Sequence, residues 1–186
     1  MLIACARRSV PSPVAKRSIA PISHGRVRLR SLEETDLPAT LAWRNQDHIR
    51  KWFLTSDVIT PAQHLAWYER YKVRDDDFVF VIEETETLRR TVGQVSLYKV
   101  DWQTGRCEFG RLMIGDPEAT GLGLARMATD CLIGYAFSEL ALREIYLEVT
   151  GGNLRAIAVY LACGFKRIES RAGVDIMRLT SGQRDA

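Results

Sequence analysis

The order of sequence patterns around residue 115 constrains the fold of this chain more than any other feature. Before it, residues 78–83, 91–100 and 105–114 form three closely spaced apolar segments, which is typical of an antiparallel meander. After it, residues 121–140 place apolar side chains along one stripe and predict a long helix. Residues 144–149 are short and mostly apolar, as expected of a strand covered on both faces. A meander followed by a strand–helix–strand crossover predicts a mixed sheet with helices on both faces.

The other segments extend this α/β plan. Further strands are predicted at residues 25–32, 165–170 and 174–179. Further helices are predicted at residues 33–45, from Pro61 onward and at 153–163. We therefore expect a mostly antiparallel sheet of about seven strands flanked by about four helices.

The domain organisation follows from length and charge. A chain of 186 residues is long enough for one domain, which we expect to span residues 26–186. Residues 1–25 hold four basic residues and no acid, and we expect them to form a flexible extension, with a transit peptide as the alternative. The rest of the chain is nearly neutral, which argues against a nucleic-acid binder. Its apolar runs are too short to span a bilayer, so we expect no membrane partner.

Cysteine usage indicates a reducing compartment. None of the four cysteines forms a pair at metal-ligand spacing, so we expect no metal site. Cys107, Cys131 and Cys163 fall in predicted strand and helix segments and are interpreted as small core residues. A cytoplasmic protein is expected.

The turn after the third meander strand is the first candidate site. Residues 114–125 read I-G-D-P-E-A-T-G-L-G-L-A, so two glycines open the long helix. Glycines let a ligand approach the backbone closely, and the free N–H groups at a helix start bind anions. A pyrophosphate fits such a turn, but a tight loop without function has the same pattern. The spacing matches neither a Walker A loop nor a dinucleotide-binding fingerprint.

A second constellation lies between residues 148 and 165. Glu148 ends a predicted strand, Asn153 is a good helix N-cap, and Tyr160 lies two turns into the helix. A carboxylate can take the proton that keeps an amine from acting as a nucleophile. Backbone N–H groups can stabilise the oxyanion formed on a thioester, and a tyrosine can protonate the departing thiolate. Each residue also has a simpler structural interpretation, as a solvated strand residue, a cap or a core-edge ring.

Together these residues resemble the GNAT superfamily of N-acetyltransferases over residues 26 to about 179. The segment T-G-L-G-L-A (120–125) resembles the family's pyrophosphate loop, and N-L-R-A-I-A-V-Y-L-A-C-G-F (153–165) resembles its second motif. The resemblance implies acetyl-coenzyme A as donor and a tyrosine acid at Tyr160, with a base at Glu148 or, on the central strand, Glu108. It implies that the donor is held by Leu112, Met113, Ile114, Thr120, Gly121, Leu122, Gly123, Leu124, Ala125, Arg126, Asn153 and Ala156.

The loop departs from the family pattern in two places. Thr120 stands where the family usually has arginine or glutamine, and Leu122 replaces a common basic residue. Thr120 can cap the helix or donate its hydroxyl. We expect Arg126 to supply the missing charge.

The acceptor is less constrained than the donor. The segments L-A-W-R-N-Q-D-H-I-R (41–50) and K-W-F-L-T (51–55), with C-E-F-G (107–110), resemble PseH-type enzymes within the RimJ/RimL-like group. This implies a small primary amine on a nucleotide-linked sugar, held by Trp43, Arg44, Asn45, Trp52 and Phe53. The alternatives are acetylation of protein N-termini, of a polyamine or of an antibiotic. A non-catalytic acyl-coenzyme A sensor is the alternative from another class, and a homodimer is left open.

Overall fold

The computed structural model describes residues 16–184, and its core element is one eight-stranded sheet. The strands are β1 (Ile22–His24), β2 (Val27–Ser31), β3 (Asp77–Glu84), β4 (Arg90–Asp101), β5 (Arg106–Ile114), β6 (Glu144–Thr150), β7 (Lys166–Arg171) and β8 (Val174–Thr180). They lie in the order β1-β2-β3-β4-β5-β6-β8-β7. Only β5 and β6 pair in parallel, because the long helix between them returns the chain to the same end of the sheet.

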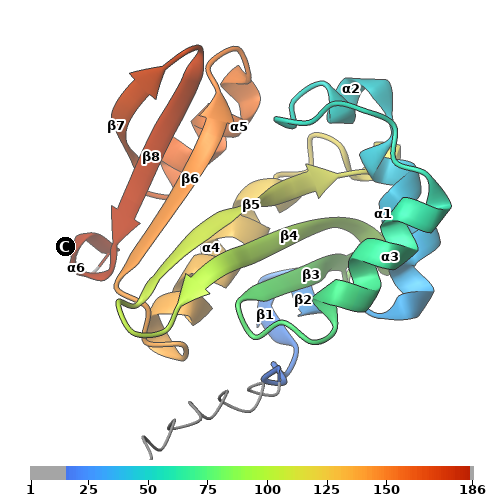
Figure 1. Cartoon of the computed structure of the whole chain (residues 1–186), viewed down its shortest axis with the longest axis horizontal. Helices are drawn as coiled ribbons and strands as arrows, with labels where there is room; N and C mark the ends of the chain where they lie inside the picture. The colour runs from blue at the N-terminus through green and yellow to red at the C-terminus, as the bar shows by residue number, and fades with distance from the viewer. Residues whose placement is uncertain (1–15, 185–186) are drawn as a thin grey trace, which may run out of the picture.

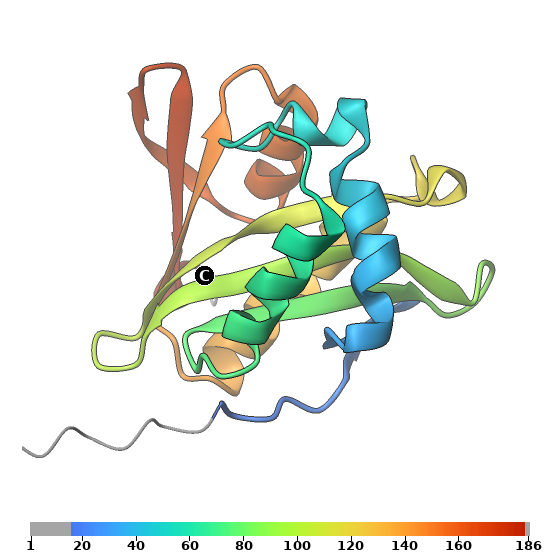
Figure 2. The same cartoon turned by 45° about the vertical axis from the view of Figure 1, so that its right-hand side comes forward.

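Helices cover both faces of the sheet. They are α1 (Leu37–Arg44), α2 (Asp47–Arg50), α3 (Pro61–Tyr71), α4 (Leu124–Ser138), α5 (Leu154–Ala162) and α6 (Ser181–Arg184). Two short 3₁₀ helices, η1 (Glu34–Asp36) and η2 (Pro117–Ala119), precede α1 and α4. Helix α4 lies behind the central strands in Figure 1, and α1 and α3 cross in front of them in Figure 2.

The core has two layers, one on each face of the sheet. The larger layer packs α4 and α5 against the sheet and includes Phe80, Phe109, Leu132, Ile145 and Phe165. The smaller layer lies under α1 and α3 and includes Leu37, Tyr68, Tyr71, Val79 and Val81. Alternate residues of β3 therefore serve opposite layers, which explains why the strand is apolar throughout.

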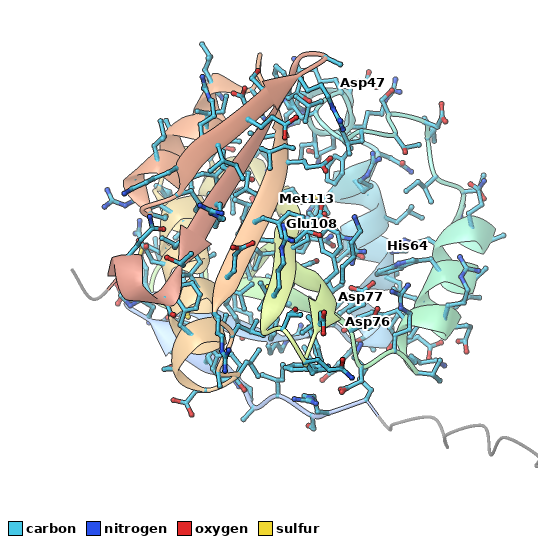
Figure 3. All side chains as sticks on the ribbon, turned by 60° about the vertical axis from the view of Figure 1, so that its left-hand side comes forward. Asp47, His64, Asp76, Asp77, Glu108 and Met113 are labelled. Atoms are coloured by element: carbon cyan, nitrogen blue, oxygen red, sulfur yellow. The ribbon has the colours of Figure 1, made fainter. Side chains whose placement is uncertain are left out.

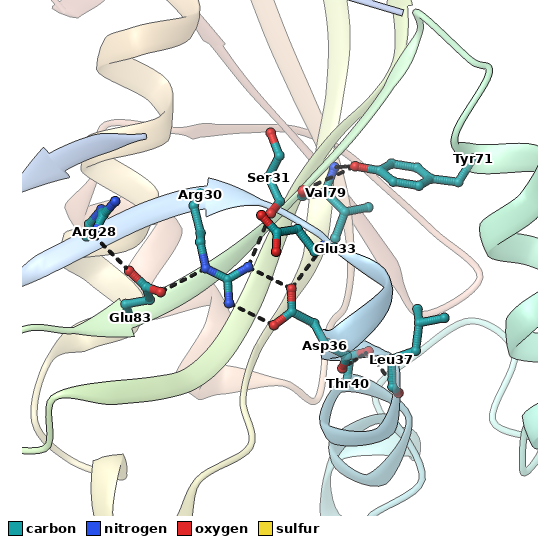
Figure 4. Close-up of polar contacts among 10 residues, drawn as sticks. All are labelled: Arg28, Arg30, Ser31, Glu33, Asp36, Leu37, Thr40, Tyr71, Val79 and Glu83. Carbon is teal, nitrogen blue, oxygen red and sulfur yellow. Dashed lines mark hydrogen bonds and ion pairs between the residues drawn. The ribbon is translucent and has the colours of Figure 1, made fainter. Parts of the chain in front are cut away.

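A buried polar network fixes α1 to the edge of the sheet. Arg30 on β2 donates to Glu83 at 2.8 Å and to both carboxylate oxygens of Asp36 at 2.7 Å (Figure 4). Asp36 precedes α1 and also accepts from the backbone N–H of Glu33. The two ion pairs at Arg30 raise the pKa of its guanidinium. The start of α1 is therefore held in one place relative to β2 and β3.

The predicted α/β class with a mixed, mostly antiparallel sheet is confirmed, with differences at its edges. The predicted helix at 33–45 divides into η1 and α1, because Pro38 starts a new helix in its first turn. Helix α2 was not predicted. The predicted seven strands become eight, because residues 22–24 add β1 to the edge.

The boundary at residue 25 also needs correction. Residues 16–25, which we assigned to the extension, contribute β1 and the buried Ile19 to the folded part of the chain. Residues 1–15, together with Cys5, lie outside the described residues. Cys107, Cys131 and Cys163 are buried, as predicted. Among residues 16–184, no helix is both long and apolar enough to cross a membrane.

Candidate active site

Strands β5 and β6 separate partway along their length. Their parallel pairing covers only Arg106–Glu108 and Glu144–Tyr146, although both strands continue beyond it. Figure 1 shows the two strands diverging beyond this paired segment. On its other side β5 stays paired to β4 as far as Ile114. The edge of residues 109–114 that faces β6 therefore has no strand partner within the described chain, and its backbone groups are available to a ligand.

A β-bulge lies in this unpaired half of β5. Gln94 of β4 pairs with Met113 and Ser96 pairs with Gly110, so two residues of β5 oppose Val95. One of the two, Arg111, has φ +50° and points toward α3. Its guanidinium forms a two-pronged ion pair with the buried Asp77, at 2.6 and 3.1 Å. The bulge thus consists of Arg111 and Leu112, and it is followed by Met113 and Ile114, so it lies within the predicted donor-binding backbone.

The glycine turn has the geometry of an anion cradle. Gly121 and Gly123 have φ +81° and +76°, and a Cβ on either would project into open space. Gly123 is the N-cap of α4 and makes no side-chain cap, so the first N–H groups of the helix keep no intrahelical or capping partner. Such a turn has the shape and the free N–H groups that a pyrophosphate needs, and its binding there stays a prediction.

Other residues of the turn differ in what they offer a ligand. Thr120 does not cap α4, because the helix begins only at Leu124, and it instead ends η2 at an exposed position. Leu124 is buried, so its side chain belongs to the core. The side chain of Arg126 is 61% exposed and lies 3.7 Å from Asp130. It is accessible to a phosphate, and its role as the basic group of the turn stays a prediction.

The second motif places Asn153 and Tyr160 at one end of the diverging strands. Asn153 caps α5 by accepting from the backbone N–H of Ala156 at 3.3 Å, as its sequence context predicts. Tyr160 is buried, with its ring edge-on to Phe109 of β5 and to Phe165, at 5.9 Å in each case. Its hydroxyl has no hydrogen-bond partner within residues 16–184, and burial raises its pKa. A phenol that stays protonated at neutral pH suits a general acid.

The two glutamates differ in environment. Glu108 is buried, and its two oxygens accept from the Tyr98 hydroxyl and the Lys99 ammonium, each at 2.6 Å. Figure 3 shows Glu108 on the side of the sheet that faces α1 and α3, along with Asp77 and His64. Glu148 is exposed on β6, two residues beyond Tyr146 and on the same face of the strand. It lines an open pocket of about 380 Å³ together with Lys99, Asp101, Arg106, Tyr146 and Ile176.

Glu148 and Tyr160 approach the diverging strands from opposite faces. Leu147 and Val149, the neighbours of Glu148, belong to the core layer that contains Tyr160. Because side chains alternate along a strand, Glu148 points to the other face. The structure therefore brings the two residues to the same strands without bringing them into contact.

The predicted acceptor residues mainly hold the α1–α3 segment in place. Trp43 packs against Gly115, where an added Cβ would lie 1.9 Å from the ring. Arg44 stacks on Phe53 at 4.0 Å and donates to the carbonyl of Thr55. Asn45 exchanges two hydrogen bonds with the backbone of Ile59, at 2.8 and 2.9 Å.

Trp52 is the most exposed of the five predicted acceptor residues. It lies beside Gly152, at the turn between β6 and α5. These five residues do not form one open wall, and their role toward an acceptor stays a prediction.

Sequence reasoning missed several residues of this site. Asp77, Tyr98, Arg111 and the loop-binding Arg26 come from four separate segments, and no local motif connects them. Among these four residues only Asp77 lies in a noticeable sequence pattern, the run of three aspartates at residues 75–77. Within residues 16–184 no group of three or more His, Cys, Asp or Glu side chains has the arrangement of a metal site.

Comparisons with known proteins agree with this geometry. Residues 26–166 match the acetyltransferase (GNAT) domain family. The spermidine N(1)-acetyltransferase of Vibrio cholerae is 27% identical over 142 residues, which cover 76% of this chain and 80% of that enzyme. The mycothiol acetyltransferase of Amycolatopsis mediterranei is 34% identical over 131 residues, 66% of this chain and 39% of the relative.

The fold is also shared with a solved structure. The spermidine N-acetyltransferase from Vibrio cholerae, in complex with coenzyme A and spermine, superposes with a TM-score of 0.78. The match covers 88% of this chain and 100% of the other at 24% identity. These relatives do not support the RimJ/RimL-like and PseH-type assignment that we drew from the sequence. The predicted acetyl-coenzyme A-dependent N-acetyltransferase is confirmed, and the chain belongs to the GNAT acetyltransferase family.

Proposed function

We propose that the chain transfers an acetyl group directly from acetyl-coenzyme A to a primary amine of a polyamine. The observation that carries the reaction is the early end of β5–β6 pairing, next to the glycine turn and Tyr160. An unpaired strand edge of residues 109–114 offers backbone groups to an extended donor arm. The spermidine acetyltransferase relatives support the acceptor class.

The donor binds along the backbone in this proposal. The pyrophosphate lies on the free N–H groups of residues 121–126, where the two glycines leave room for it. The arm and thioester follow Leu112, Met113 and Ile114, beyond the bulge. Asn153 and Ala156, at the start of α5, lie on the other side of the arm.

In the reaction the acceptor ammonium loses two protons and the departing thiolate gains one. Glu148 takes the first of two protons that the acceptor ammonium loses, directly or through a water molecule, because only the neutral amine can attack the thioester carbon. Backbone N–H groups of β5 stabilise the tetrahedral oxyanion. The carbon–sulfur bond then breaks, and Tyr160 gives its proton to the coenzyme A thiolate. The nitrogen loses its second proton to water, and the Tyr160 oxygen is reprotonated from solvent. The products are the N-acetylated amine and free coenzyme A.

Glu148 suits the base role better than Glu108. Both oxygens of Glu108 already accept hydrogen bonds, one of them from a cation. The Glu148 side chain has no ion-pair partner within residues 16–184 and faces the open pocket. We therefore assign Glu108 a supporting role, in which it holds Tyr98 and Lys99.

Charge in the pocket favours a polycationic acceptor. Its two basic side chains are already paired, Lys99 with Glu108 at 2.6 Å and Arg106 with Glu144 at 2.9 Å. Its two acids, Asp101 and Glu148, have no ion-pair partner among the described residues. An excess of unpaired carboxylates attracts ammonium groups. A nucleotide-linked sugar would bring phosphates to the same carboxylates, which like-charge repulsion disfavours.

The experiment measures thiol release from acetyl-coenzyme A with a panel of amines. We expect turnover with spermidine and spermine, a lower kcat in Glu148→Gln because the base is lost, and a larger KM for spermidine in Asp101→Asn. Turnover with peptide N-termini or nucleotide-linked amino sugars alone would keep the chemistry and overturn the polyamine acceptor. An unchanged kcat in Glu148→Gln, with a large loss in Glu108→Gln, would reverse the assignment of the base.

The assembly is a separate part of the proposal. The Vibrio cholerae spermidine N-acetyltransferase has a dodecameric structure, with a TM-score of 0.70 to this chain, 24% identity, and 86% and 96% of the two chains covered. We propose that this chain also associates with copies of itself, beyond the homodimer left open by the sequence. Light scattering on the purified protein tests this, and a monomer at micromolar concentration would contradict it.

A further inference from the structure

Arg26 reaches the glycine turn from the opposite edge of the sheet. It lies directly before β2, and its Nη2 donates to the carbonyl oxygen of Leu122 at 2.6 Å. The two residues are 96 positions apart in the sequence. Leu122 lies between Gly121 and Gly123, so this contact is made at the centre of the turn.

The backbone of Arg26 is held firmly in place. Its carbonyl accepts from both the backbone N–H and the hydroxyl of Thr85, at 3.0 and 3.1 Å. The preceding Gly25 has φ +55° and packs on Met127 of α4, where an added Cβ would lie 2.6 Å from the side chain. The backbone at Arg26 is therefore held by hydrogen bonds from Thr85 and by the packing of Gly25 on the first turn of α4.

The hydrogen bond determines which way the turn presents its N–H groups. In a trans peptide the C=O and the following N–H point in opposite directions. With the Leu122 carbonyl directed at Arg26, the N–H of Gly123 points away from Arg26. This leaves it available to a ligand in the cradle.

Arg26 also adds charge that the turn lacks. Residues 115–125 contain Asp116 and Glu118 but no basic residue. Both acids pair with Arg90, at 2.6 and 2.7 Å. Arg26 has no carboxylate partner among residues 16–184, so its charge is not neutralised there. An unpaired guanidinium beside free N–H groups raises the positive potential of the site.

We propose that Arg26 is a positioning residue for the donor diphosphate, taking the place of a basic residue at Thr120 or Leu122. It fixes the peptide between Leu122 and Gly123 and supplies a positive charge behind the turn. This inference rests on the proposed placement of the donor pyrophosphate at residues 121–126.

The test is calorimetric binding of coenzyme A, which needs no acceptor. We expect Arg26→Met to raise the Kd about tenfold, because the variant loses both the positive charge and the hydrogen bond that orients the peptide between Leu122 and Gly123. The Kd of Arg26→Met should also depend less steeply on salt, because one positive charge is gone. Arg26→Gln keeps a donor for the Leu122 carbonyl without the charge, and should give an intermediate Kd.

Arg28→Met is the matched control. Arg28 lies two residues further on and pairs with Glu83 at 3.7 Å, away from the turn. It should leave both the Kd and its salt dependence unchanged. If Arg26→Met fails to fold, Arg26→Gln decides, and a Kd within twofold of the wild type in the folded variant overturns the inference.

Gly123→Val separates this inference from the placement of the donor. Its side chain would enter the cradle and would also strain a residue at φ +76°. If Gly123→Val weakens coenzyme A binding and Arg26→Met does not, the role of Arg26 alone is wrong. If Gly123→Val binds coenzyme A like the wild type, the donor lies elsewhere and both proposals fall.

Discussion

The two sides of the diverging strands are built in different ways. The donor side, residues 115–126 and 153–160, consists of backbone groups shaped by glycines and a helix cap. The acceptor side is the face of β4, β5 and β6 that carries Tyr98, Glu108, Tyr146 and Glu148, and it consists of side chains in ion pairs and hydrogen bonds. We infer from this difference that local backbone geometry is enough to bind a donor that is the same molecule throughout the family. Selection of an acceptor instead depends on charged side chains that come from distant segments.

Tyr160→Phe should have the largest effect. The variant keeps the ring contacts with Phe109 and Phe165 and loses only a hydroxyl that has no hydrogen-bond partner within residues 16–184. We expect kcat to fall by about 10²–10³ because the thiolate loses its acid. Thermal unfolding should stay within about 2 °C of the wild type.

Tyr135→Phe serves as its control. Tyr135 is a half-buried tyrosine of α4, away from the diverging strands. Its kcat should equal that of the wild type. An unchanged kcat in Tyr160→Phe would show that Tyr160 is not the general acid.

Asp77→Asn probes the support of the acceptor side. The change leaves Arg111 beside a neutral amide in a buried environment, with the bulge of β5 attached to it. We expect a loss of about 3 kcal/mol in the free energy of unfolding, measured with urea. The neighbouring Asp76→Asn breaks only the exposed pair with Arg74 and should cost under about 1 kcal/mol. Equal losses would show that the Arg111 pair does not support the bulge.

Gly115→Ala tests the contact between the two sides. The new methyl group would overlap the ring of Trp43, which must move together with α1. We expect a loss of about 2 kcal/mol in stability and a rise in the KM values of both substrates. Gly182→Ala, where an added Cβ meets nothing within 4 Å, is the control and should be near neutral. A KM change for one substrate only would mean that the two sides are independent.

His64→Gln should have the smallest effect, on the pH dependence of stability. His64 stacks on Trp67 at 5.2 Å and contacts Thr40 at 3.2 Å, and its burial lowers its pKa. As the pH decreases through the unfolded pKa of about 6.5, the unfolded chain takes up a proton at this site before the folded chain does. The free energy of unfolding therefore decreases as the pH decreases. The variant should lose less stability than the wild type between pH 7.5 and 5.5. The exposed His48→Gln is the control, and identical pH profiles for His64→Gln and the wild type would contradict the prediction.

Much of the fold could be predicted from the sequence because its signals are local. The meander and the crossover follow from apolar periodicity and turn residues, and the helix starts at Pro61 and Asn153 follow from single side chains. The errors lie where tertiary contacts outweigh weak patterns. Residues 22–24 form an edge strand only because β2 offers them a partner. The relatives also do not support the PseH-type resemblance, which used residues such as Trp43, Arg44 and Asn45 that hold the fold.

The sequence by itself determined the family and the donor chemistry, since the glycines, Asn153 and Tyr160 act within short segments. Only the tertiary structure showed that both carboxylate oxygens of Glu108 are occupied, because Tyr98 and Lys99 lie on the neighbouring strand β4 beside it. It also showed the hydrogen bond of Arg26 to the carbonyl of Leu122, which lies 96 positions away. The physical reason is that backbone shape and capping depend on neighbouring residues, whereas the pairing of charges depends on strand register, a bulge and the packing of helices on a sheet.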